Sequence, residues 1–91
     1  MINNQETVNE SELESTDDTE LDLNLLESIR KFGLQVPLDI SPINSPHGVY
    51  QVIHGKRRLR ACLELGIIDI LVKRMSSELT KEQREEYILM A

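Results

Sequence analysis

The stretch His54-Gly55-Lys56-Arg57-Arg58-Leu59-Arg60-Ala61 decides the fold, because it joins a strand to a helix through a glycine. The residues before it, Val49–Ile53, are rich in β-branched side chains and predict a strand. The residues after Gly55 place apolar side chains at helical spacing, which predicts a helix over Lys56–Leu65 that ends at Gly66. The stretch therefore predicts a strand-to-helix turn with four cations in and just after the first helical turn.

Cations are unusual at the start of a helix, since this end already carries about half a positive charge. Unbonded backbone N–H groups also point outward there. Both features favour a bound anion, and phosphate is the obvious candidate, with Gly55 allowing a close approach of the backbone. A solvated helix face is the alternative explanation. Helical spacing places Lys56 and Arg60 on one side and points Arg57 and Arg58 elsewhere, so at least one cation is expected to contact solvent or a partner.

His54 and Cys62 are the two other reactive side chains near this turn. His54 directly precedes Gly55, where it could contact phosphate or relay a proton near neutral pH. The alternative is a partly buried histidine at the end of a strand. Cys62 lies on the apolar side of the helix and is expected in the core, and as the single cysteine it excludes an internal disulfide or a cysteine-based zinc cluster.

The flanking sequence predicts further elements in the order helix, strand, strand, helix, strand, helix. They are helices over Asp22–Phe32 and from Thr80, strands over Leu38–Ile40 and Ile67–Val72, and a turn over Ser41–Gly48. The continuous apolar run Ile67–Val72 predicts a strand covered on both faces. The last helix still continues at Ala91, which predicts a chain truncated within it. The pattern indicates a small α+β domain with a single mixed sheet and flanking helices.

Charge divides the chain unevenly. Residues 1–27 hold nine acids and no Lys or Arg, whereas residues 28–91 hold all ten Lys and Arg and seven acids. Because residues 1–19 are acidic and poor in apolar side chains, they predict a flexible tail ahead of a folded domain over residues 20–91. The tail could compete with nucleic acid or phosphate for the basic site. It could equally be a solubilising extension or a first strand too weak to recognise.

Composition excludes several classes of protein. Ninety-one residues allow one small domain, and one Phe, two Tyr and no Trp argue against a base-stacking surface. No apolar run approaches the roughly 18 residues of a membrane span, and no signal peptide opens the sequence, so an intracellular, cytoplasmic chain without membrane contact is expected. The acids Asp39, Glu64 and Asp69 are scattered and predict surface charges rather than a catalytic metal site.

Two segments resemble a known family. They are Leu26-x-Ser28-Ile29-Arg30-x-x-Gly33-Leu34-Gln35-x-Pro37-Leu38 and Tyr50-Gln51-Val52-Ile53-x-Gly55-Lys56-Arg57-Arg58-Leu59-Arg60-Ala61. Together they look like the N-terminal domain of ParB-type partition proteins, in the ParB/sulfiredoxin superfamily. The resemblance covers Leu21 to Ala91, and the signature Gly-x-x-Arg-x-x-Ala matches at Gly55, Arg58 and Ala61.

The resemblance implies binding of CTP, or another nucleoside triphosphate, together with Mg²⁺. Its implied contacts are Gly55, Lys56, Arg57, Arg58 and His54 at the phosphates and Gly33, Gln35 and Pro37 in a turn that borders the nucleotide. It implies a switch in DNA partition or related regulation, acting through a second copy or a partition ATPase. DNA contact would need a longer chain or a partner, since a helix-turn-helix module is absent from these residues.

This sequence departs from the family pattern at three places. Lys56 replaces the usual glutamate, no basic residue precedes Arg30, and the family's Glu-Asn-x-x-Arg segment would lie past Ala91. These departures leave nucleotide hydrolysis open. Lys56 also occupies the place of the sulfiredoxin cysteine, which argues against sulfinic acid reduction. The alternatives are a ParB-like phosphotransferase or nuclease, and a protein-interaction module without enzyme activity.

Overall fold

The computed structural model describes residues 6–75, which form a small α+β domain as the sequence predicts. Its elements are β1 (Glu6–Asn9), a 3₁₀ turn η1 (Glu10–Glu12), α1 (Leu23–Phe32), β2 (Leu38–Ile40), β3 (Val52–His54), α2 (Lys56–Glu64) and β4 (Asp69–Arg74). The helix expected from Thr80 lies outside the described residues. No helix among residues 6–75 is long and apolar enough to cross a bilayer.

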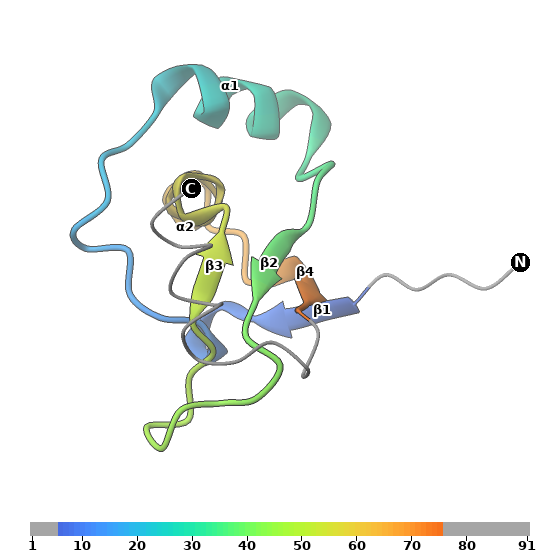
Figure 1. The fold of residues 1–91 in the computed structure, drawn as a ribbon. Helices are drawn as coiled ribbons and strands as arrows, with labels where there is room; N and C mark the ends of the chain where they lie inside the picture. The colour runs from blue at the N-terminus through green and yellow to red at the C-terminus, as the bar shows by residue number, and fades with distance from the viewer. Residues whose placement is uncertain (1–5, 76–91) are drawn as a thin grey trace, which may run out of the picture.

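The strands form one mixed sheet in the order β1-β4-β2-β3 (Figure 1). In the middle of the sheet β4 runs parallel to β2, while β1 and β3 pair antiparallel with these two strands at the edges. In Figure 1 α2 is seen end-on between α1 and the sheet, so the two helices stack on the same side. This layering makes α2 the central element of the fold.

The N-terminal acidic segment is ordered from Glu6 onward, so the prediction of a flexible tail is wrong for residues 6–19. β1 pairs with β4 from Glu6 opposite Val72 to Asn9 opposite Asp69. Val8 and Leu13 are buried, whereas the polar residues on either side of them are exposed or half-buried. The mean composition conceals this alternation, and two buried apolar side chains together with a sheet ladder offset the ordering entropy.

Hydrogen bonds of the Arg74 side chain join this first strand to the end of β4. Its Nε and Nη2 donate to the two carboxylate oxygens of Glu6 at 2.7–3.0 Å, and its Nη1 donates to the Pro42 carbonyl at 3.2 Å. The guanidinium also lies 4.5 Å from the ring centroid of Tyr50. Hydrogen bonding to Glu6 raises the pKa of Arg74 still further. One side chain thus connects the edge strand β1, the end of β4 and the segment between β2 and β3.

The helices follow their predicted bounds closely. Asp22 caps α1 by accepting a hydrogen bond from the Leu25 N–H at 3.1 Å, and Gly33 ends it with a φ of +76°. β2 has its predicted bounds, whereas β3 and β4 begin later in the chain than predicted. β3 begins at Val52 and β4 at Asp69.

The prediction that the last strand is covered on both faces is wrong. Along β4, Ile70 and Val72 are buried, whereas Asp69 and Lys73 are exposed. The alternation follows from a fold in which both helices stack on the same side of the sheet. The apolar run begins at Ile67, but Ile67 and Ile68 belong to the connection after α2, and Ile68 is exposed.

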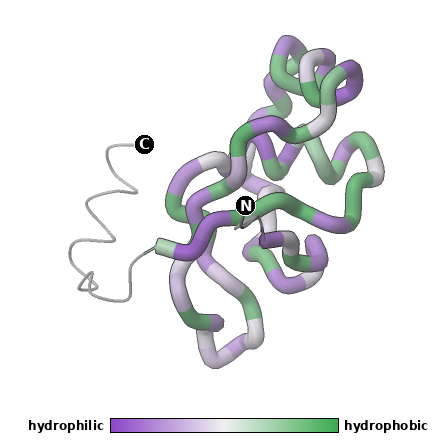
Figure 2. Tube along the Cα trace, turned by 90° about the vertical axis from the view of Figure 1, so that its right-hand side faces the viewer, coloured by the Kyte–Doolittle hydropathy of each residue, from purple (hydrophilic) through white to green (hydrophobic). Residues whose placement is uncertain are grey.

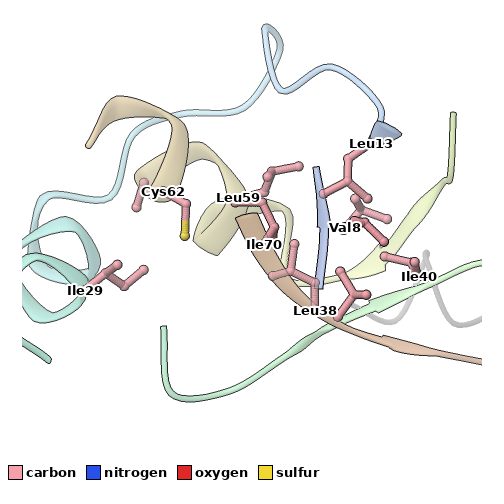
Figure 3. Packing of buried hydrophobic residues seen from close by; sticks show 11 residues of the cluster. Val8, Leu13, Ile29, Leu38, Ile40, Leu59, Cys62 and Ile70 are labelled. Carbon is pink, nitrogen blue, oxygen red and sulfur yellow. The ribbon is translucent and has the colours of Figure 1, made fainter. Parts of the chain in front are cut away.

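The hydrophobic core lies between α2 and the sheet. Its fully buried side chains are Leu38, Ile40, Leu59, Cys62 and Ile70. Figure 3 shows Ile29 and Cys62 at the α1 end of the cluster and Val8 and Leu13 at the opposite end. Hydrophilic and hydrophobic residues alternate closely along the chain (Figure 2). Cys62 is a core residue, as predicted, and its burial raises the pKa of the thiol.

The described N-terminal segment generates a first prediction, on Leu13. Leu13→Ala should lower the free energy of unfolding by about 2–5 kcal/mol, because the variant leaves a cavity in the core. Leu23→Ala is the matched control, since Leu23 is 69% exposed, and it should change stability by less than about 0.5 kcal/mol. Urea unfolding measures both variants. Equal stability of the two variants would show that the N-terminal segment does not dock.

Gly55 generates a second prediction. A Cβ at this position would stand 2.7 Å from Leu38 Cδ2, and the φ of +101° disfavours any other residue. Gly55→Ala should therefore lower the free energy of unfolding through about 1–2 kcal/mol of backbone strain and a further ~1–3 kcal/mol of overpacking. Gly66 has a φ of +75° and open space around it, so Gly66→Ala should show only the backbone cost. Thermal or urea unfolding of the pair separates the two causes, and a Gly66→Ala loss as large as that of Gly55→Ala would refute the packing argument.

Candidate functional site

The turn between β3 and α2 leaves the start of the helix open. Gly55 is the N-cap residue of α2 and makes no side-chain capping hydrogen bond. The first helical bond runs from the Leu59 N–H to the Gly55 carbonyl at 3.0 Å. The N–H groups of Lys56, Arg57 and Arg58 precede that bond, so they have no partner within the helix. Three backbone donors and the positive end of the helix dipole therefore meet at one place.

A pocket of about 590 Å³ opens at this turn. Five of the residues that line it are ones that the sequence predicts for phosphate contact. The others are Asp22 and Leu25 at the start of α1 and two strand residues. The predicted members are His54, Gly55, Lys56, Arg57 and Arg58, and the strand residues are Val52 and Ile53. Three cations and one carboxylate among the lining residues make the pocket electropositive.

The predicted turn residues Gly33, Gln35 and Pro37 do not line this pocket. Gly33 and Gln35 follow the C-terminal end of α1, whereas the opposite end of that helix borders the pocket. The ten residues of α1 separate the two ends by roughly 15 Å. The Gln35 side chain donates to the Phe32 carbonyl, which keeps it at the helix end. Pro37 directly precedes Leu38, whose backbone approaches Gly55.

The four cations of the turn differ in the contacts that they make. The Nη1 of Arg58 lies 3.2 Å from the place where a Gly55 Cβ would stand, so its guanidinium folds over the turn. Lys56 Nζ lies 3.0 Å from Asp18 Oδ1. Arg60 pairs with Glu64 at 2.7 Å and lies outside the pocket lining. Within residues 6–75 neither Arg57 nor Arg58 makes an ion pair, and Arg57 is exposed.

This arrangement corrects the grouping predicted from helical spacing. Lys56 lines the pocket with Arg57 and Arg58, and Arg60 lies apart from it. The reason is that Lys56 is the first residue of α2. A side chain at the end of a helix can extend across the terminus, so the i, i+4 rule holds poorly there.

His54 and Asp39 form a pair across the sheet. They are opposite each other in the register of β2 and β3, and His54 Nδ1 lies 3.4 Å from Asp39 Oδ2. Asp39 therefore has a partner and is not an isolated surface charge. His54 is a half-buried residue at the end of its strand, and it also lines the pocket.

Two acidic residues that precede α1, Asp18 and Asp22, lie at the pocket. The Asp18–Lys56 contact lowers the pKa of the Asp18 carboxyl, first through the hydrogen bond and then through the positive charge of Lys56. Asp22 lines the pocket while it caps α1. Within residues 6–75 no group of three or more His, Cys, Asp or Glu side chains is arranged to hold a metal ion.

Comparisons with known proteins agree with this architecture. The chain is 51% identical over 59 residues to a Rhizobium rhizogenes protein named "Putative replication protein B", an alignment that spans 65% of this chain and 18% of that protein. The structure of this chain is similar to that of the chromosome-partitioning protein ParB from Caulobacter crescentus complexed with CTP-gamma-S. That comparison has a TM-score of 0.71 and 23% identity, over 97% of this chain and 52% of that one.

Sulfiredoxin from Arabidopsis thaliana is also similar in structure, with a TM-score of 0.67 and 27% identity over 92% of this chain and 96% of that one. This chain therefore spans about half of the crystallised ParB and under a fifth of the Rhizobium rhizogenes protein. The family described as the ParB N-terminal domain matches residues 3–89. With that match and the mixed sheet and strand-to-helix turn described above, the chain belongs to the ParB N-terminal domain family.

Proposed function

We propose that this domain binds a nucleoside triphosphate, CTP, with the phosphates on the turn at Gly55. The observation that carries the proposal is the pair of arginines in the pocket. Arg57 and Arg58 make no ion pair within residues 6–75, yet both line a pocket at a positively polarised helix end. Two cations held together without a counterion are stabilised by a bound polyanion.

Each residue of the turn would have a distinct role. Gly55 lines the pocket, and a phosphate there would accept hydrogen bonds from the backbone N–H groups that follow it at the start of α2. Arg58, folded over the turn, would donate to phosphate oxygens, and exposed Arg57 would reach the end of the triphosphate. Lys56 would add a point charge and His54 a side-chain contact at the strand end. We expect Mg²⁺ to arrive bound to phosphate oxygens, as this hard cation prefers.

The choice of CTP is supported by the structural relative that was crystallised with a CTP analogue. The biological role we propose is a nucleotide-dependent switch in DNA partition or replication control in the cytoplasm. In this role the domain would respond to nucleotide by pairing with a second copy or with a partition ATPase. Contact with DNA would be made by a longer chain or a partner.

Calorimetric titration with CTP, ATP and GTP, each with magnesium, tests the proposal. We expect preferential binding of CTP. Arg58→Ala should weaken it by about 10-fold to 100-fold, because a hydrogen bond to a charged group contributes ~1.5–3 kcal/mol. Arg60→Ala is the matched control, since Arg60 has its own partner and lies outside the pocket lining. Unchanged affinity in Arg58→Ala would refute the phosphate site.

The same titration, together with assays of nucleotide turnover and of DNA nicking, separates the alternatives. Preference for ATP with turnover, or nicking of DNA, would support the phosphotransferase or nuclease alternative. Failure of all three nucleotides to bind would favour an interaction module whose arginines contact an acidic partner.

A further inference from the structure

The acidic segment, residues 17–22, crosses the edge of the pocket on its way from η1 to α1. It holds Asp17, Asp18, Glu20 and Asp22 and has no Lys or Arg. In Figure 1 the chain between η1 and α1 runs along the outside of β3 and α2. Four carboxylates in six residues therefore pass beside the proposed phosphate site.

Contacts on both sides hold the acidic segment in this place. Before it, a carboxylate oxygen of Glu14 accepts a hydrogen bond from the Val52 N–H at 2.8 Å, and Thr16 is buried. At its C-terminal end, Asp22 is fixed as the N-cap of α1. The position of the acidic segment beside the pocket thus follows from anchors other than the Asp18–Lys56 contact.

One contact joins the acidic segment to the pocket directly. Asp18 Oδ1 lies 3.0 Å from Lys56 Nζ, and the Asp18 side chain is 79% exposed. Among the three cations that line the pocket, Lys56 is the one paired with a carboxylate within residues 6–75. A triphosphate on the turn would meet a Lys56 ammonium group that is already paired with Asp18, and it would also be repelled by the Asp18 carboxylate.

We propose that Asp18 is an internal competitor of the phosphate ligand: Asp18 pairs with Lys56, and the ligand displaces Asp18 from Lys56 when it binds. The inference rests on the proposed function and adds a residue that sets its affinity. Asp18 is exposed, so salt screens its attraction to Lys56 over a Debye length of about 8–10 Å. Competition therefore lowers affinity at low ionic strength and fades as salt is added.

The test measures the binding of CTP and of inorganic triphosphate, with magnesium, to the wild-type chain and to two variants. Asp18→Asn should tighten binding about twofold to fivefold at low salt, the range expected for an exposed ion pair. Asp17→Asn is the matched control: it removes the same charge at the neighbouring residue, and the Asp17 carboxylate makes no ion pair within residues 6–75. It should tighten binding less, and the difference between the variants should shrink at high salt.

A second readout is the pKa of Asp18, followed by NMR. In the free chain Lys56 holds this pKa below its usual range, and saturation with CTP should raise it because the carboxylate loses Lys56 and faces phosphate. An Asp18 pKa unmoved by bound CTP, or equal tightening in both variants, would overturn the competition alone. If neither ligand bound any of the three chains, the proposed function would fall and the competition with it.

Discussion

The close approach of the Leu38 side chain to the backbone of Gly55 is the constraint on which the rest of the structure depends. A Cβ at Gly55 would stand 2.7 Å from Leu38 Cδ2, so only glycine leaves β2 this close to the start of α2. Leu38 is fully buried and belongs to a strand that pairs with both β3 and β4. Gly55 also lines the pocket at the start of α2. Stability and the candidate site therefore share one residue.

The electrostatics of the turn oppose the local rule for helices. A helix start favours acidic side chains, and here it carries Lys56, Arg57 and Arg58 without a capping side chain. Part of this repulsion is relieved by Asp18 on Lys56. Arg57 and Arg58 lack such a partner among residues 6–75, so no carboxylate in this part of the chain relieves the repulsion between them. A local rule broken in this way is typical of a binding site, where the ligand supplies the missing counterion.

What the sequence could predict was local, and what it missed depends on contacts between distant segments. The helices and the Gly55 turn follow from periodicity and capping within about ten residues. β1 was missed because its four residues are held by β4, more than 50 positions later, and by the bond between Glu6 and Arg74. Likewise, the sequence singled out residues 54–58 as candidate phosphate contacts, and these residues line the pocket. The contributions of Asp22 and Leu25 depend on the packing of α1 against α2, which no spacing in the sequence encodes.

The N-terminal segment combines two kinds of interaction that respond differently to their surroundings. Leu13 and Thr16 are held by burial, and the backbone of Glu14 bonds to the Tyr50 carbonyl at 3.1 Å. These contacts are short-ranged and depend little on ionic strength. The Asp18–Lys56 pair, in contrast, is exposed and screened by salt. Because the anchors stand on both sides of the pair, Asp18 can leave Lys56 without undocking β1. The charge of the pocket can therefore change while the fold that positions it stays in place.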